Sequence, residues 1–254
     1  MLECIDLGIT FGGLKAVDNF NVTIGRTEIT GLIGPNGAGK TTVFNLLTKV
    51  YQPTHGTILL NGKDIHDLNT AQVNRAGIAR TFQNIRLFGE LSVEENITVA
   101  MDTQMHYTMP EGIFRLPRFW KEERIVHERA MELLSIFHME DLAKAKASSL
   151  PYGAQRRLEI LRALATNPSL LLLDEPAAGM NPSETAELME NIRSIRDTFK
   201  IAVLLIEHDM NLVMNICEGI AVLNFGHVIA KGTPEDIQNN PEVIEAYLGK
   251  QKEA

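Results

Sequence analysis

The chain has 254 residues, of which 44% are hydrophobic and 22% are charged, as is usual for a globular protein with a sizeable core. Its formal net charge of −8 argues against a nucleic-acid partner, because phosphate backbones attract a basic face. The aliphatic runs Leu170–Leu173 and Ile201–Ile206 are far shorter than the roughly 20 residues that cross a bilayer. Cys4 and Cys217 lack metal-ligand spacing, so we interpret them as reduced structural thiols of a cytosolic protein.

The first third of the chain begins with strand patterns. Residues 2–33 contain short apolar runs that are broken by glycine and Asp-Asn turns. Phe11 lies at the end of the first run, where its ring could stack on a nucleotide base or could be a half-buried strand aromatic. The sequence does not choose between these two interpretations. Further strands are predicted at Thr57–Leu60 and Ile78–Phe82, the second of which ends at Gln83.

A glycine-rich segment follows the strand pattern at Ile29–Ile33 and precedes a helical pattern. It fits G-x-x-x-x-G-K-[ST], and a strand before it and a helix after it are the setting that this phosphate-binding loop requires. Glycines let the backbone curl so that N–H groups point at phosphate oxygens, and the helix N-terminus adds partial positive charge. We expect Lys40 to reach the β- and γ-phosphates and Thr41 to help hold Mg²⁺. The predicted nucleotide-binding residues are Gly34, Pro35, Asn36, Gly37, Ala38, Gly39, Lys40, Thr41 and Thr42.

Residues from about 85 to 165 have a mostly helical pattern. Ser92–Glu95 is a capping box, and apolar spacing predicts helices at Lys121–Phe137 and Arg156–Ala165. The segment Met101–Trp120 is rich in Met, aromatic residues and Pro. It is either a docking surface for another protein or a long loop that covers its own cluster of side chains. The pattern therefore indicates a helical block inserted into an α/β frame.

The last third of the chain alternates strand and helix patterns. Strands are predicted at the two aliphatic runs and near Ile220–Leu223 and Val228–Ala230. Asn181, Thr233 and Asn240 each precede a proline, and this arrangement favours the start of a helix. Alternation of this kind implies a mainly parallel sheet flanked by helices.

Four polar side chains follow predicted strands. They are Gln83, Asp174, Glu175 and His208. Because ligands bind outside the carboxyl ends of parallel strands, we expect these groups to meet at the phosphate loop. Asp174 is the expected partner of Mg²⁺, and Glu175 is placed to orient or deprotonate an attacking water. Gln83 can touch the metal or the water, and His208 can bind the γ-phosphate or hold Glu175 in line. A single Gln or His at a strand end is usually structural, so these last two roles depend on the resemblance described next.

With these residues assembled, the chain resembles the ATP-binding cassettes of ABC transporters over essentially its whole length. Several separate motifs occur in the family's order. They are the phosphate loop Gly34–Thr42, the Q-loop Gln83, the signature region Leu150–Arg157, the Walker B strand Leu170–Glu175, the D-loop Ala178–Asn181 and the switch His208. Phe11 falls where the family has a base-stacking aromatic residue.

The resemblance implies an α/β fold of the P-loop NTPase (RecA-like) class. Such a fold has a mainly parallel sheet core, an N-terminal antiparallel β part and an inserted α-helical subdomain. We expect a single ATPase domain over residues 1–254. Residues 1–84 and 166–254 would form its catalytic core, and residues of approximately 85–165 its helical subdomain with the signature motif.

The signature region departs from the family's usual L-S-G-G-Q. Pro151, Tyr152 and Ala154 replace the usual residues, and after Leu150 only Gly153 keeps its identity. Pro151 has neither a hydroxyl nor an N–H to offer a γ-phosphate. The resemblance implies that Gly153 contacts the ATP held by a second cassette.

The subtype resembles the ATP-binding subunit of branched-chain amino acid importers. The residues that carry this likeness are Leu150–Leu164, Asp174–Pro182 and the extra Met101–Trp120 segment. Cassettes for urea or lipopolysaccharide share the style of D-loop and are alternatives. A soluble ABC ATPase without a transport role is another, although such relatives usually carry two cassettes or a long coiled-coil insertion.

The resemblance also implies partners and a location. We expect a second ATP-binding cassette, which is an identical chain or a paralogue, and transmembrane permease subunits, with a solute-binding protein acting indirectly. ATP and Mg²⁺ are the expected substrate and cofactor. The expected location is cytoplasmic and peripheral, on the inner face of the cell membrane.

Overall fold

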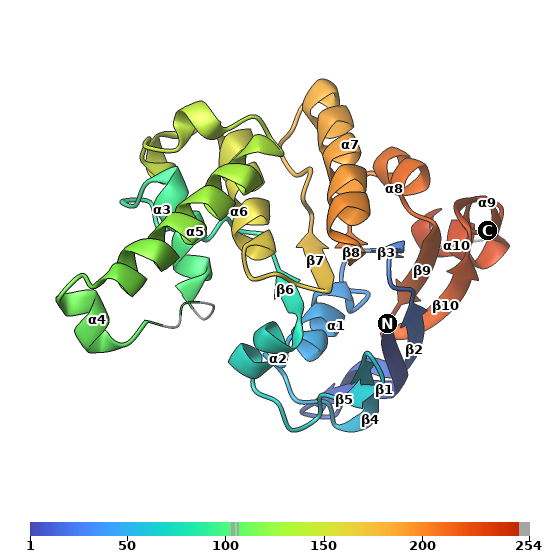
Figure 1. The fold of residues 1–254 in the computed structure, drawn as a ribbon. Coiled ribbons are helices and arrows are strands. Elements are labelled where there is room, and N and C mark those ends of the chain that lie inside the picture. Colours follow the sequence, from blue (N-terminus) through green and yellow to red (C-terminus); the bar gives the residue numbers. More distant parts are fainter. Residues whose placement is uncertain (103–104, 106, 249–254) are drawn as a thin grey trace. The chain divides into compact units, whose positions relative to one another are not determined.

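The computed structural model of the chain describes residues 1–102, 105 and 107–248. The chain divides into two compact units (Figure 1). The first consists of Met1–Gln83 together with the chain from Pro168 onward, and the second consists of Asn84–Asn167. In the described residues, no helix is both long enough and apolar enough to cross a membrane.

The first unit contains a six-stranded sheet in the order β10-β9-β3-β8-β7-β6. Neighbouring strands are parallel, except that β10 is antiparallel to β9. Every residue of β3, β7 and β8 is buried, as expected for parallel strands covered on both faces. The strands are β3 (Ile29–Ile33), β6 (Ile78–Arg80), β7 (Leu170–Asp174), β8 (Ala202–Ile206), β9 (Gly219–Asn224) and β10 (His227–Gly232). The mainly parallel sheet predicted from the sequence is therefore confirmed.

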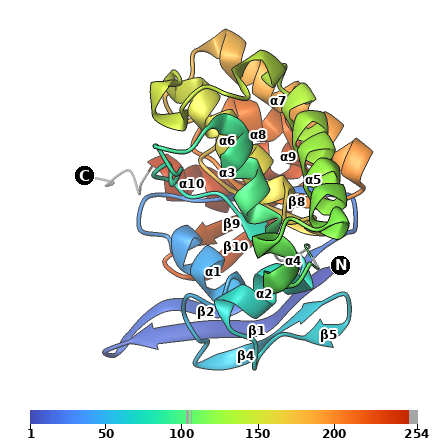
Figure 2. The ribbon, with the colours of Figure 1, turned by 60° about the vertical axis from the view of Figure 1, so that its left-hand side comes forward.

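A second, four-stranded sheet in this unit is antiparallel, in the order β2-β1-β4-β5. Figure 2 shows its strands side by side below α1 (Lys40–Leu47) and α2 (Thr70–Ala76). Its members are β1 (Leu2–Phe11), β2 (Leu14–Ile24), β4 (His55–Leu60) and β5 (Lys63–Asp64). This sheet is the antiparallel part that the family resemblance implied.

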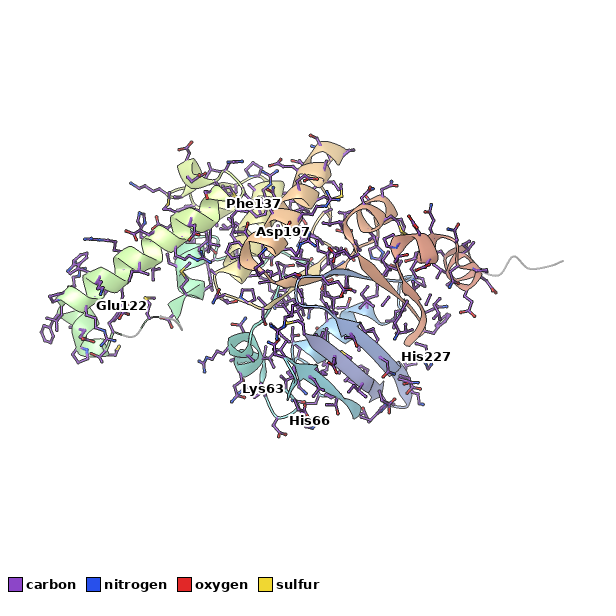
Figure 3. The ribbon with its side chains drawn as sticks, turned by 45° about the vertical axis from the view of Figure 1, so that its right-hand side comes forward. Lys63, His66, Glu122, Phe137, Asp197 and His227 are labelled. Atoms are coloured by element: carbon purple, nitrogen blue, oxygen red, sulfur yellow. The ribbon has the colours of Figure 1, made fainter. Side chains whose placement is uncertain are left out.

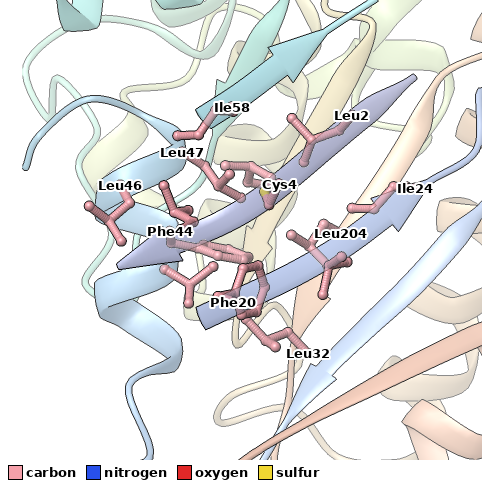
Figure 4. Packing of buried hydrophobic residues seen from close by; sticks show 14 of the residues in the cluster. Leu2, Cys4, Phe20, Ile24, Leu32, Phe44, Leu46, Leu47, Ile58 and Leu204 are labelled. Atoms are coloured by element: carbon pink, nitrogen blue, oxygen red, sulfur yellow. The ribbon is translucent and has the colours of Figure 1, made fainter. Parts of the chain in front are cut away.

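Helix α1 joins the two sheets through one hydrophobic core. Its residues Phe44, Leu46 and Leu47 are fully buried. They pack in the same cluster as Phe20 of β2 and Leu204 of β8 (Figure 4). Because α1 directly follows the phosphate loop, this packing fixes the loop relative to both sheets.

The remaining helices of the first unit are α7 (Pro182–Phe199), α8 (Met210–Ile216), α9 (Pro234–Gln238) and α10 (Pro241–Leu248). All of them except α8, which Asp209 caps, begin at caps that the sequence predicted. The Asn181 and Thr233 side chains accept the predicted capping bonds from the backbone N–H groups of Glu184 and Asp236. Asn240 accepts bonds from the backbone at the start of α10. These ends follow local rules, which explains why they were predictable.

The two cysteines belong to the first unit and both thiols are free. Each is buried, and burial raises the pKa of each thiol to about 12. Such thiols stay protonated at neutral pH and are poor nucleophiles. Their surroundings agree with a structural role.

The second unit is helical. Its α-helices are α3 (Val93–Ala100), α4 (Met109–Ile113), α5 (Pro117–Ser135) and α6 (Tyr152–Leu164), with 3₁₀ turns at Glu140–Leu142 and Ala147–Ser149. Helices α3, α5 and α6 contact one another. The predicted capping box of Ser92 and Glu95 is present. Figure 3 shows the length of α5, with Glu122 near its first turns and Phe137 just past its last. The helix begins four residues earlier than predicted, because Pro117 occupies its first turn, where a missing N–H costs nothing.

The Met101–Trp120 segment is not one long loop, because it contains α4 and the start of α5. Docking of another protein on it stays a prediction. Met101 is buried, and the Phe119 ring makes edge contacts with Tyr107 and Trp120 at 5.1 and 5.4 Å between centroids. Other large apolar side chains are exposed, namely Met109, Ile113, Phe114 and Leu116. Residues 103, 104 and 106 lie outside the described residues. The segment therefore covers a small cluster and also presents an apolar surface.

Candidate active site

The phosphate loop connects β3 to α1 and curls around the Lys40 ammonium. Lys40 Nζ donates hydrogen bonds to the carbonyl oxygens of Gly34 and Pro35, at 2.7 and 3.0 Å. Burial lowers the pKa of Lys40, and the nearby carboxylates of Glu175 and Asp174 act in the opposite direction. The ammonium is thus held within the loop, where it can exchange carbonyl oxygens for phosphate oxygens.

Two glycines of this loop are required by its geometry. Gly34 and Gly39 have φ angles of 149° and 108°. A Cβ at Gly34 would lie 2.0 Å from the Leu223 carbonyl oxygen, and one at Gly39 would lie 2.7 Å from that of Ala16. Side chains at these positions would therefore push the loop away from its neighbours.

A cavity of about 420 Å³ lies in front of the loop, within the first unit. It contains seven of the nine predicted loop residues together with three of the four predicted strand-end groups. Those residues are Asn36, Gly37, Ala38, Gly39, Lys40, Thr41 and Thr42, with Gln83, Glu175 and His208. The structure therefore brings together predicted residues as far apart in the sequence as Asn36 and His208, which are 172 positions apart.

Five lining residues were missed by the sequence reasoning. They are Leu14, Lys15, Ala16, Phe225 and Gly226. Their place is set by backbone bonds between distant segments, since the Asp18 N–H donates to Gly226 O and the Gly226 N–H donates to Ala38 O. No local sequence pattern predicts such bonds. The one available signal was that Leu14, Lys15 and Ala16 follow Phe11, the predicted base-stacking residue, within five positions.

Glu175 lines the cavity and contacts two other strand-end groups. Its φ of 51° is left-handed, and its N–H donates to Ile206 O at 2.9 Å. One carboxylate oxygen accepts from Gln83 Nε2 at 3.2 Å, and the other lies 2.9 Å from His208 Nε2. A strained backbone at such a position is typical of a functional site. Gln83 and His208 thus each contact the Glu175 carboxylate.

Asp174, the last residue of β7, does not line the cavity surface. Its carboxylate is buried and forms an ion pair with Arg80 Nη2 at 2.8 Å from Oδ2. Its N–H donates to Thr81 Oγ1 at 3.2 Å. Asp174 therefore lies just behind Glu175, with one oxygen already bound to a cation.

The donor set fits Mg²⁺. The predicted ligands supply a hydroxyl, an amide oxygen and a carboxylate, from Thr41, Gln83 and Asp174, and these are the hard oxygen donors that this ion prefers. In the part of the chain that the structure describes, no group of three or more His, Cys, Asp or Glu side chains could hold a metal alone. Mg²⁺ commonly binds through one or two carboxylates and the phosphates of a nucleotide, so such a group is not needed.

Glu207 is a further residue that the sequence reasoning did not single out. It is 5% exposed and accepts hydrogen bonds from the N–H groups of Ala177 and His208, at 2.8 and 3.1 Å. Burial raises its pKa, and these backbone bonds oppose the rise. Glu207 thereby connects the segment after Glu175 to the switch histidine.

Two further predicted site residues, Phe11 and Gly153, are not among those that line the cavity. The Phe11 ring makes an edge contact with Tyr51 at 5.2 Å and is 43% exposed, so base stacking by Phe11 stays a prediction. Among the lining residues, Phe225 has an aromatic ring. Gly153 is in the first turn of α6, in the second unit, where Pro151 is the N-cap residue. Its predicted contact is with the ATP of another chain.

The family model for ABC transporters matches residues 17–178. The chain belongs to the ABC transporter family. A second model, for a branched-chain amino acid ATP-binding cassette transporter, matches residues 227–253. The residues that the first model matches include the phosphate loop, Asp174 and Glu175.

Several characterised ABC proteins are similar to the chain along nearly its full length. It is 49% identical to the high-affinity branched-chain amino acid transport ATP-binding protein LivG of Escherichia coli K12, covering 98% of each chain. It is 47% identical to the corresponding protein BraF of Pseudomonas aeruginosa, again over 98% of each chain. The crystal structure of the ADP conformation of MJ1267, an ABC transporter cassette, aligns with a TM-score of 0.85 at 30% identity, covering 98% of this chain and 99% of that one. The predicted P-loop NTPase fold is therefore confirmed.

Proposed function

We propose that this ABC ATPase powers a membrane importer of branched-chain amino acids. The observation that carries the proposal is the likeness to LivG and BraF, whose names state this transport and which match 98% of the chain. The match of residues 227–253 to a branched-chain amino acid cassette supports it. The location follows from this role, on the inner face of the membrane against permease subunits.

The residues of the cavity suit ATP hydrolysis. The loop amides and Lys40 bind the phosphates, and burial of the ammonium strengthens its attraction to them. Thr41, Gln83 and Asp174 would hold Mg²⁺, which when bound neutralises charge on the β- and γ-phosphates. Glu175 orients the attacking water and accepts its proton. His208 holds the Glu175 carboxylate from the opposite side to Gln83.

Two cassettes would act as a head-to-tail pair, with each ATP held by the loop of one and by Gly153 of the other. Shifting such a pair from mostly open to mostly closed needs about 5.5 kcal/mol of differential affinity. Two ATP molecules would then contribute about 2.7 kcal/mol each, which a few charge-assisted hydrogen bonds supply. Loss of the γ-phosphate removes these bonds and reopens the pair.

The substitution Gly153→Asp is expected to separate binding from hydrolysis. A carboxylate in the first turn of α6 would repel the γ-phosphate of the partner's ATP, while the chain's own loop is untouched. We expect nucleotide affinity to stay within about twofold and hydrolysis to fall at least about 100-fold, which corresponds to about 2.7 kcal/mol. Phosphate release and nucleotide binding measured on the assembled transporter check this result. Unchanged hydrolysis would show that the degenerate signature is not used.

A cassette for lipopolysaccharide is the second candidate, because the chain is also 34% identical to the lipopolysaccharide export system ATP-binding protein LptB of E. coli over 98% of its length. The higher identity to LivG favours amino acid import. A urea cassette and a soluble ABC ATPase without a permease are further alternatives.

Uptake of labelled leucine by cells that lack this gene tests the proposal. We expect uptake to fall to background, and to return with the intact gene but not with Glu175→Gln. Normal leucine uptake without the gene would contradict the proposed solute. Failure of the chain to copurify with any polytopic membrane protein would contradict the transport role itself.

A further inference from the structure

Arg80 is a buried arginine at the end of β6 that no sequence motif singled out. Its side chain is 7% exposed. Nη2 donates to Asp174 Oδ2 at 2.8 Å, and Nη1 donates to Asn45 Oδ1 at 2.7 Å. One guanidinium therefore connects the end of β7 with the helix that follows the phosphate loop.

The guanidinium has a restricted orientation. It lies over the rings of Phe44 and Phe82, with its central carbon 5.4 and 5.2 Å from their centroids. Its Nε is buried and has no hydrogen-bond partner among the residues that the structure describes. Contacts with the two rings, Asn45 and Asp174 jointly set the pose of the guanidinium.

This arrangement limits what the Asp174 carboxylate can do. Oδ2 is bound to Arg80, and the Asp174 N–H is bound to Thr81, the residue next to Arg80. Rotation of the carboxylate would break the Arg80 bond in a buried setting, where a charge-assisted bond is strong. Oδ1 is therefore the oxygen left to face a metal ion or its water.

The same arginine also fixes the other side of the expected metal site. Asn45 follows Thr41 by four residues on α1, so their side chains are neighbours on one face of the helix. Arg80 thus sets the spacing between Asp174 and the helix that carries the Thr41 hydroxyl. Thr41 on α1 and Asp174 at the end of β7 are expected to approach Mg²⁺ from these two different elements.

We propose that Arg80 is a positioning residue for the metal site, holding the Asp174 carboxylate in one orientation and at a fixed spacing from Thr41. The proposal rests on the metal role of Asp174 in the proposed function. The competing explanation is that Arg80 only neutralises a buried carboxylate. Loss of a positioning residue changes metal affinity, whereas loss of a merely structural partner lowers stability and leaves metal affinity unchanged.

The test uses Arg80→Lys and Arg80→Met in the full-length chain. Lysine keeps the charge, but its ammonium lacks the planar fork that reaches both Asn45 and Asp174. Binding of a fluorescent, non-hydrolysable ATP analogue is titrated with Mg²⁺, and the spectrum of bound Mn²⁺ is recorded by electron paramagnetic resonance. We expect the Mg²⁺ midpoint to rise about tenfold or more in both variants, since such supporting contacts typically contribute 10- to 100-fold. Analogue affinity in EDTA should stay within about twofold, which also shows that the variants fold.

Two controls separate the possible failures. Arg196→Lys weakens an ion pair with Glu218 in the same unit and should leave the Mg²⁺ midpoint unchanged. Asp174→Asn should raise the Mg²⁺ midpoint, as we expect of the Arg80 variants. An unchanged midpoint in Asp174→Asn would contradict the metal role in the proposed function. A raised midpoint in Asp174→Asn with unchanged midpoints in both Arg80 variants would overturn the positioning role.

A milder variant covers the case in which Arg80→Met does not fold. Asn45→Ala keeps the ion pair between Arg80 and Asp174 and removes only the hydrogen bond from Arg80 to α1. A higher Mg²⁺ midpoint in this variant supports the proposal. An unchanged midpoint contradicts the part of it that concerns the spacing from Thr41.

Discussion

The substitution Glu175→Gln is expected to lower ATP hydrolysis by a factor of about 10³ while leaving ATP binding intact. An amide keeps the size of the side chain but cannot accept the proton of the attacking water, and a general base contributes about 10²–10⁴ to the rate. Glu175 is also the only one of the two strand-end carboxylates that lines the described cavity. Single-turnover phosphate release from the assembled transporter measures the effect.

The same variant should accumulate as a closed pair of cassettes, because the γ-phosphate that bridges the halves persists. Size-exclusion chromatography with ATP and Mg²⁺ detects that pair. Glu190→Gln is the matched control, since Glu190 is an exposed glutamate on α7 that pairs with Arg193. Near-normal turnover in Glu175→Gln would rule out the proposed role in orienting and deprotonating water.

The substitution Lys40→Ala is expected to weaken ATP binding at least about 100-fold. The ammonium makes two hydrogen bonds to loop carbonyl oxygens, and we expect it to make comparable charged bonds to phosphate oxygens. Two such bonds at about 1.5 kcal/mol each correspond to about 3 kcal/mol, or roughly a 100-fold change in affinity. Isothermal titration calorimetry with ATP and Mg²⁺ measures this loss.

A matched control for this variant is Lys63→Ala. Lys63 is an exposed lysine of β5, at the edge of the antiparallel sheet in the same unit (Figure 3). Its removal should leave ATP affinity unchanged. Tight ATP binding by Lys40→Ala would mean that the backbone amides alone hold the phosphates.

The parts of the site that follow local rules could be predicted from the sequence. The phosphate loop has a fixed spacing, and the polar groups after β6, β7 and β8 lie at the carboxyl ends of strands, where parallel sheets collect their ligands. Two of those groups, Gln83 and His208, indeed contact a third, Glu175. Helix starts at Asn181 and Thr233 were equally predictable, because the cap and proline signals are local.

Contacts between distant segments could not be predicted in this way. In the sequence Arg80 looks like an ordinary strand residue. Its role depends on the pairing of β6 with β7 and on its bonds to Asp174 and to Asn45 of α1. Glu207 likewise looks like one of many glutamates, and its importance lies in bonds to backbone N–H groups 30 and one positions away. Phe225 lines the cavity only because of the position that the β9–β10 turn takes in the folded chain. The periodicity of a single sequence does not indicate which distant residues contact one another.

The central claim is that one site holds the triphosphate, the metal-binding carboxylate and the water-activating carboxylate. A crystal structure of Glu175→Gln with ATP and Mg²⁺ tests it most directly. We expect the phosphates along the amides of Gly37–Thr42, the ion between Thr41 and Asp174, and the substituted side chain facing the γ-phosphate. Nucleotide bound at another surface, or phosphates in the loop with residues 174 and 175 both turned away from them, would contradict the account.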